Sequence, residues 1–207
     1  MAQLFNDQLL QTLETLVRQH HTIYPRLPPQ GLFFESLVER AFHLCGAPDA
    51  QIVQTSPNAP QHDLLVAGTK ISLKTETGKG TSPTLIAITK LCTTEKEPWT
   101  AQVLVHRVMQ HLSRYERMLM LRAVWPGKQN FIHYQLVEIP ADLLRLIGSV
   151  TLVPVGRRTG RQSLAGDVQY QGAVAFRVHF DGADGKCQVR NLPVSLCQML
   201  REWDQRT

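Results

Sequence analysis

Charged residues gather in one short stretch of the chain, between residues 63 and 76. Asp63 opens an apolar run, a Gly-Thr pair marks a turn, and a second run carries Lys74 and Glu76. Because the side chains of a strand alternate between its two faces, Ser72, Lys74 and Glu76 are predicted to project from one side. A hairpin would bring Asp63 back beside that row. One ammonium and two carboxylates are groups that metal-assisted phosphodiester cleavage uses, so this stretch is a candidate nuclease site.

The plain alternative is the exposed polar face of an ordinary hairpin. Apolar neighbours at Leu64–Val66, Ile71 and Leu73 favour interior strands. Charged side chains are rare in such strands unless they are paired or functional. The following loop, residues 77–82, is rich in glycine and hydroxyl groups and contains Lys79. Such a loop can approach a phosphate backbone closely, and Lys79 is a candidate DNA contact.

The elements that must position this stretch follow from apolar spacing, prolines and glycines. They predict a mixed α/β fold, with a central sheet flanked by helices. The predicted helices span 3–20, 31–45, 98–117, 140–148 and 193–204. The predicted strands, besides the hairpin, span 51–54, 84–91, 118–124, 131–137, 150–155, 173–181 and 186–190.

Composition indicates a folded protein with a substantial core. The chain has 207 residues, of which 43% are hydrophobic, so a single domain over 1–207 is expected and disorder is excluded as the main state. No apolar run has the roughly 18–20 residues of a membrane span, and the N-terminus lacks the pattern of a signal peptide. No membrane partner is expected.

Cysteine, histidine and net charge narrow the chemistry further. The four cysteines are scattered and the eight histidines form no metal-binding motif, so zinc and disulfides are not expected. Reduced thiols and a cytoplasmic location are the expectation. The formal net charge of +5 favours a polyanionic partner such as nucleic acid.

A second group of candidate residues lies in a glycine-rich segment with Arg157, Arg158, Arg161 and Gln162. Arginine presents a fork that matches guanine, and glutamine can pair with adenine, so this loop is a candidate reader of DNA bases. The alternative is a solvated basic turn that touches only phosphates, or nothing. Arg190, on a predicted strand, is either a further DNA contact or part of an ordinary polar sheet face.

The stretch from Asp63 resembles the PD-(D/E)xK signature of the nuclease superfamily that includes many type II restriction endonucleases. In that family an aspartate begins one strand and Glu-x-Lys follows on the next. Here His62 stands where the family has proline, Ser72 occupies the second acidic position, and Lys74 is the motif lysine. The predicted order of elements over residues 31–117 also fits the family core.

The resemblance implies a restriction-endonuclease-like core and a Mg²⁺-dependent type II enzyme that cleaves double-stranded DNA at specific sequences. By the same resemblance, Asp63, the backbone carbonyl near Leu73 and a further carboxylate hold the ion. Lys74 positions or deprotonates the attacking water and stabilises the developing charge.

The serine at position 72 leaves the identity of the second carboxylate open. Glu76 is one candidate, because it lies on the same predicted strand face. Glu35 is the other, since many members of the superfamily carry an acidic residue on the upstream helix. Glu35 is otherwise an ordinary solvent-facing residue, and Glu39 one turn later competes with it.

The resemblance also suggests a division of labour. Residues 31–117 are expected to form the catalytic core, and residues 150–207 the DNA-recognition or peripheral part. Because a duplex target is often two-fold symmetric, a homodimer is the prior expectation.

Three other interpretations remain open from the sequence. One is a structure- or damage-selective repair nuclease of the same superfamily. Another is a DNA-binding module whose catalytic site has decayed, for which Ser72 is the best argument. The third is a cytoplasmic α/β domain unrelated to DNA, with an incidental match to the motif.

Overall fold

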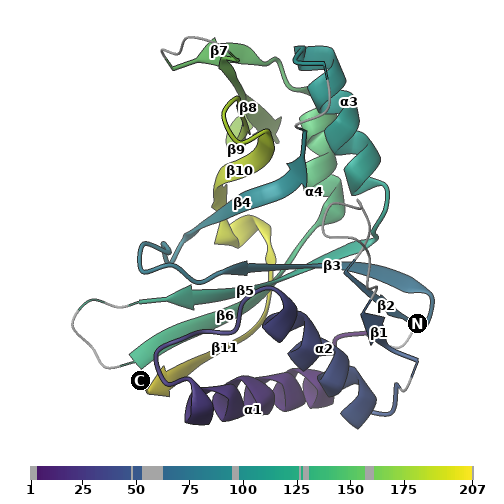
Figure 1. Ribbon diagram of the computed structural model, residues 1–207, viewed down its shortest axis with the longest axis vertical. Helices are drawn as coiled ribbons and strands as arrows, with labels where there is room; N and C mark the ends of the chain where they lie inside the picture. Colours follow the sequence, from purple (N-terminus) through teal and green to yellow (C-terminus); the bar gives the residue numbers. More distant parts are fainter. Residues whose placement is uncertain are drawn as a thin grey trace.

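The protein is built on two β-sheets with helices around them (Figure 1). The computed structural model describes residues 4–47, 49–52, 63–94, 98–125, 127, 131–156 and 161–206. The predicted α/β class, with a mixed central sheet flanked by helices, is confirmed.

The first sheet has six strands and contains the predicted hairpin. β3 and β5 run parallel, and every other neighbouring pair in this sheet is antiparallel. In spatial order the strands are β1 (Gln51–Ile52), β2 (Leu64–Val66), β3 (Thr69–Glu76), β5 (Arg117–Val124), β6 (Phe131–Ile139) and β11 (Gln198–Arg206). Helices α1 (Asp7–Ile23) and α2 (Leu32–Leu44) pack on one face of this sheet.

The second sheet is antiparallel and has five strands. In spatial order they are β4 (Leu85–Thr93), β10 (Lys186–Pro193), β9 (Ala173–Asp181), β8 (Ser163–Tyr170) and β7 (Val153–Val155). Helices α3 (Ala101–Leu112) and α4 (Ala141–Arg145) stand beside it in Figure 1, and short 3-10 turns occupy Leu146–Ser149 and Val194–Leu196.

Strand β5 lies between two hydrophobic cores, which explains its largely apolar sequence. Leu119 and Leu121 belong to the core beneath α1 and α2. Met118 and Met120 point the other way, into the core shared with α3 and the second sheet. The first sheet is therefore covered on both faces, by helices on one side and by the second sheet with α3 on the other.

Two predicted helices were wrong in type or length, and one strand was missed. The predicted C-terminal helix at 193–204 is instead a 3-10 turn followed by β11, which pairs with β6. Pairing with β6 places Trp203 against Tyr134, with ring centroids 5.1 Å apart, so a tertiary partner overrides the local helical pattern. The helix predicted over 98–117 ends at Leu112, and strand β8 was missed.

None of the helices in the described ranges is both long and apolar enough to cross a membrane.

Candidate active site

The predicted hairpin is present as β2 and β3, and it brings Asp63 back to the middle of β3. The backbone N–H of Asp63 donates to the carbonyl of Ile71 at 2.9 Å. The turn is Ala67-Gly68 rather than the predicted Gly-Thr pair, because Thr69 already belongs to β3. The φ angles of Ala67 and Gly68 are 46° and 78°, a conformation that suits a two-residue hairpin loop. The short turn fixes the register of the strands, and with it the position of Asp63.

The Asp63 carboxylate is the centre of the site. Its Oδ2 accepts hydrogen bonds from Ser72 Oγ at 3.0 Å, from the backbone N–H of Leu73 at 2.6 Å and from Lys74 Nζ at 3.3 Å. The structure thus brings Asp63, Ser72, Leu73 and Lys74 together. Hydrogen bonds to a carboxylate are stronger than neutral ones, so this aspartate is held firmly.

Lys74 lies between the two oxygen groups that were expected to bind a metal ion. Its Nζ contacts Asp63 and also donates to the carbonyl of Leu73 at 3.1 Å. Ser72 is buried, with 1% exposure, and its hydroxyl supports Asp63. The serine at the vacant acidic position therefore orients the first carboxylate.

Glu35 faces this group from the first turn of α2. It lines a cavity of about 330 Å³ together with Leu73, Lys74 and Thr75. Burial raises the pKa of Glu35, the negative charge of Asp63 raises it further, and the charge of Lys74 lowers it. Glu35 is the acidic residue among the described residues that line this cavity.

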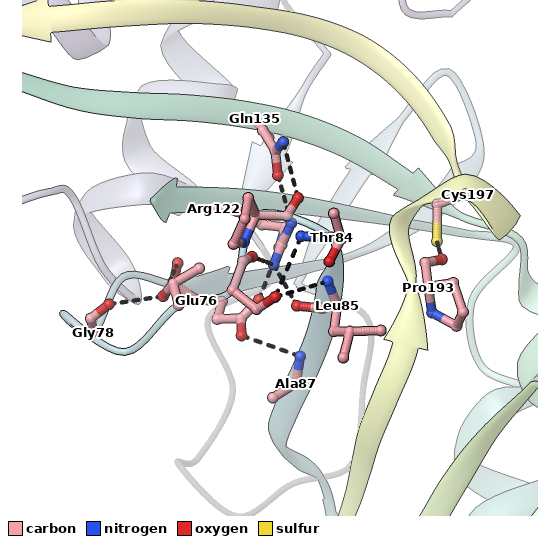
Figure 2. A network of polar contacts seen from close by, with 12 residues as sticks. Glu76, Gly78, Thr84, Leu85, Ala87, Arg122, Gln135, Pro193 and Cys197 are labelled. Carbon is pink, nitrogen blue, oxygen red and sulfur yellow. Dashed lines mark hydrogen bonds and ion pairs between the residues drawn. The ribbon is translucent and has the colours of Figure 1, made fainter. Parts of the chain in front are cut away.

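Glu76 has different surroundings. Its Oε2 accepts a hydrogen bond from Arg122 Nε at 2.8 Å, and its Oε1 accepts one from the backbone N–H of Ala87 at 3.1 Å (Figure 2). Arg122 also donates to the side chain of Gln135. Burial raises the pKa of Glu76, and the hydrogen bond and charge of Arg122 oppose that shift. Both oxygens of Glu76 are thus engaged within the protein.

Arg122 is a structural residue that the sequence reasoning missed. It is fully buried, and its Nη2 donates to the carbonyl of Leu85 (Figure 2). The same nitrogen donates to the carbonyl of Ser82, and both distances are 2.6 Å. These bonds tie the loop at 77–84 to the first sheet, and the exposed Lys79 lies on that loop. The available signal was a lone arginine within the apolar run of β5.

Two further residues of the cavity were also missed, Thr89 and Lys90 of β4. A lysine within a largely apolar strand was the signal for them. They place the second sheet at the edge of the site, since β4 is its first strand.

His111 of α3 lies buried near the same charges. Its ring contacts Tyr115 edge-on with centroids 5.5 Å apart, and neither ring nitrogen has a hydrogen-bond partner among the described residues. Burial lowers the pKa of His111 to about 4, and the charges of Lys74 and Arg114 act in the same direction. This histidine is therefore neutral at physiological pH.

The described residues contain no cluster of three or more histidine, cysteine, aspartate or glutamate side chains that would hold a metal ion unaided. Asp63, Glu35 and the carbonyl of Leu73 offer oxygen atoms only. Oxygen ligands suit a hard divalent cation, and Mg²⁺ usually keeps several of its own waters. This donor set therefore fits such an ion better than zinc.

The predicted arginine-rich loop is only partly described. Arg157 and Arg158 lie outside the described residues. The guanidinium of Arg161 stacks over the ring of Trp99, 4.9 Å from its centroid. Gln162 Nε2 donates to the carbonyl of Gly156 at 3.0 Å. The end of this loop is therefore packed against the segment that leads into α3.

Arg190 belongs to a polar face of the second sheet. It stands directly opposite Arg177, and Gln188 stands opposite His179. Arg190 donates to Gln188 Oε1, and Arg177 donates to Asp167 at 2.8 Å. Burial, and then the charges of Arg190 and Arg177, lower the pKa of His179. The carboxylate of Asp167 offsets part of the repulsion between the two opposed arginines.

Comparison with known proteins identifies the family. Residues 1–205 match the SmaI model, described as type II site-specific deoxyribonuclease. The chain belongs to this family. It is 29% identical to the type II restriction enzyme SmaI of Serratia marcescens over 206 residues, which is 97% of this chain and 81% of that enzyme. A solved restriction endonuclease in complex with substrate DNA aligns with 75% of this chain and 76% of its own, at 19% identity and a TM-score of 0.37.

Membership in the SmaI family confirms the predicted function, a sequence-specific restriction endonuclease that acts on DNA. Two of the alternative interpretations, a repair nuclease and an α/β domain unrelated to DNA, are therefore excluded. The matched region covers nearly the whole sequence, so both sheets belong to the family fold.

Proposed function

We propose that this member of the SmaI family cleaves double-stranded DNA at the cavity between α2, β3 and β4, with Mg²⁺ as cofactor. The observation that carries the proposal is the contact of Lys74 with both Asp63 and the Leu73 carbonyl, opposite Glu35. The ammonium of Lys74 and two oxygen groups that can bind a metal ion then lie together where a phosphate can enter.

We infer that Asp63, the Leu73 carbonyl and Glu35 hold the metal ion. The raised pKa of Glu35 supports this choice, because a buried carboxylate near Asp63 is favoured by a bound cation. Glu76 is less suited, since Arg122 and Ala87 engage its two oxygens. A bound divalent ion would supply charge stabilisation and lower the pKa of a coordinated water.

The protein groups have separate tasks in this proposal. Ser72 and the Leu73 N–H keep the Asp63 carboxylate in one orientation. Lys74, which lies at the cavity wall, donates a hydrogen bond to the attacking water or to a phosphate oxygen. Its positive charge stabilises the negative charge that develops on the phosphate in the transition state.

We propose one nuclease domain with two contributions. Residues 31–117 provide the catalytic core, and residues 150–207 contact DNA, although β11 of the latter part also completes the first sheet. Support comes from the opposed Arg177 and Arg190 on the second sheet.

The individual DNA contacts are part of the same proposal. The group is made up of basic or amide side chains from three parts of the chain. They are Lys79 on the loop at 77–84, Arg157, Arg158, Arg161 and Gln162 on the arginine-rich loop, and Arg190 on β10.

We further propose that the enzyme acts as a homodimer in the cytoplasm. A dimer with a two-fold axis would match the symmetry of a palindromic target and present one active site to each strand. Sedimentation of the free enzyme and of its DNA complex measures the oligomeric state.

Cleavage of phage DNA with and without Mg²⁺ tests the proposed chemistry. We expect Asp63→Asn to slow cleavage at least 100-fold while leaving DNA affinity in Ca²⁺ largely intact. Asp142→Asn, which alters an exposed aspartate on α4 outside residues 31–117 and 150–207, is the matched control and should cleave normally. Cleavage by the wild type in EDTA, or by Asp63→Asn at the normal rate, would refute the proposal.

A further inference from the structure

Strand β4 carries an irregularity beside the active-site cavity. Its pairing with β10 joins Ile88 to Val189 and Cys92 to Cys187. One residue of β10 separates these two pairs, whereas three residues of β4, 89–91, lie between them. β4 therefore contains two additional residues at this point, which form a β-bulge.

The bulge decides which way Lys90 points. In regular antiparallel pairing from Ile88 and Val189, Lys90 would stand opposite Cys187, which is fully buried in the core. The two additional residues give that position to Cys92, which is buried as well. Lys90 is exposed instead and lines the cavity. Bulges commonly redirect a side chain near an active site.

No contact with another described residue explains the position of Lys90. Within the described ranges, no hydrogen bond or ion pair engages its ammonium. Lys74, the other lysine of the cavity wall, is paired with Asp63 at 3.3 Å. Glu35 shares the cavity with Lys90, yet the charges that shift the pKa of Glu35 are those of Asp63 and Lys74.

We propose that Lys90, directed into the cavity by the bulge of β4, binds a backbone phosphate of the DNA substrate, with the hydroxyl of neighbouring Thr89 as a second donor. An ammonium that has no partner among the described residues, at the wall of an open cavity, suits a phosphate oxygen. The contact fixes where the strand lies relative to Asp63 and Lys74. This inference rests on the proposed function, because it assumes that the scissile strand enters this cavity.

The experiment measures binding of one DNA duplex in Ca²⁺, which prevents cleavage. Its sequence is that of the cut site, obtained by sequencing the ends of digested phage DNA. We expect Lys90→Ala to weaken binding about tenfold and to lower the slope of log affinity against log salt by about 1. Lys90→Arg should restore most of the affinity. Lys70→Ala, an exposed lysine on β3 outside the cavity wall, is the matched control and should change neither quantity.

Neutral methylphosphonates, placed at one phosphate at a time, identify the contact. When the methylphosphonate replaces the phosphate bound by Lys90, we expect the wild type to bind the duplex more weakly. Lys90→Ala should bind this modified duplex as well as it binds the unmodified one. A Lys90→Ala protein that melts like the wild type but binds equally well would overturn the inference. The inference would also be overturned if every methylphosphonate weakened binding by Lys90→Ala as much as it weakens binding by the wild type, because no phosphate would then depend on Lys90.

These outcomes are separable from failure of the proposed function. If Asp63→Asn cleaves DNA normally, the proposed function fails, whatever Lys90 does. If Asp63→Asn is inactive while Lys90→Ala binds like the wild type, only the inference about Lys90 fails.

Discussion

Replacing Glu76 with alanine tests whether this residue supports the fold or binds the metal ion. The change removes the carboxylate that accepts a hydrogen bond from the fully buried Arg122. Leaving one charge of a buried pair without its partner costs about 3–5 kcal/mol. In a protein of this size, that corresponds to a fall in Tm of roughly 6–20 °C.

The assay is thermal and urea unfolding in EDTA, so that metal binding does not contribute. Asp167→Ala removes an acid from an exposed ion pair with Arg177 and is the comparison. It should cost at most about 1 kcal/mol. Combining Glu76→Gln with Arg122→Met removes both charges, but it also removes the bonds of Arg122 to the Ser82 and Leu85 carbonyls, so only part of the stability should return.

A different result would refute this reasoning. If Glu76→Ala melts no lower than Asp167→Ala but needs far more Mg²⁺ for half-maximal cleavage, then Glu76 is a metal ligand. The bonds of Glu76 to Arg122 and Ala87 would then have to break when the ion binds.

Three further predictions concern groups around the cavity. Glu35→Gln should abolish cleavage. In EDTA at pH 8 the variant should be more stable than the wild type, because burial raises the pKa of Glu35 and so disfavours its charged form in the folded state. Stability from such a group is present below its unfolded pKa of about 4.5 and lost as pH rises, so the two proteins should converge near pH 4. His111→Phe should make the protein less sensitive to acid, because folding lowers the pKa of His111 from 6.5 to about 4. Between pH 7 and pH 3 in urea titrations, the free energy of unfolding should fall by up to about 3 kcal/mol more in the wild type than in the variant. Ser72→Ala removes one of the hydrogen bonds to Asp63 and should slow single-turnover cleavage about tenfold, at a cost of about 1 kcal/mol in stability and with unchanged DNA affinity.

The sequence predicted the hairpin and the meeting of Asp63, Ser72 and Lys74 because that arrangement is local. Alternation along one strand and a short turn are sufficient to place these side chains. The choice between Glu35 and Glu76 was beyond the sequence. It depends on Arg122, which is 46 residues from Glu76 in the chain and meets it only when β3 and β5 pair.

The same reason explains the other misses. β11 is a strand because β6 offers it a partner, and Trp203 stacks on Tyr134 in that pairing. The position of Lys90 depends on the register between β4 and β10, which are about a hundred residues apart. Short segments whose partners are distant in sequence carry little local information about their structure.

The two faces of β3 have a consequence for how this enzyme can change in evolution. Ile71 and Leu73 belong to the core under the helices, while Ser72 and Lys74 alternate with them. Inserting or deleting one residue in β3 would exchange these faces, burying the lysine among apolar side chains and exposing the leucines. We therefore expect this strand to tolerate point substitutions far better than changes of length. Variation in length between relatives should accumulate in loops outside residues 63–76.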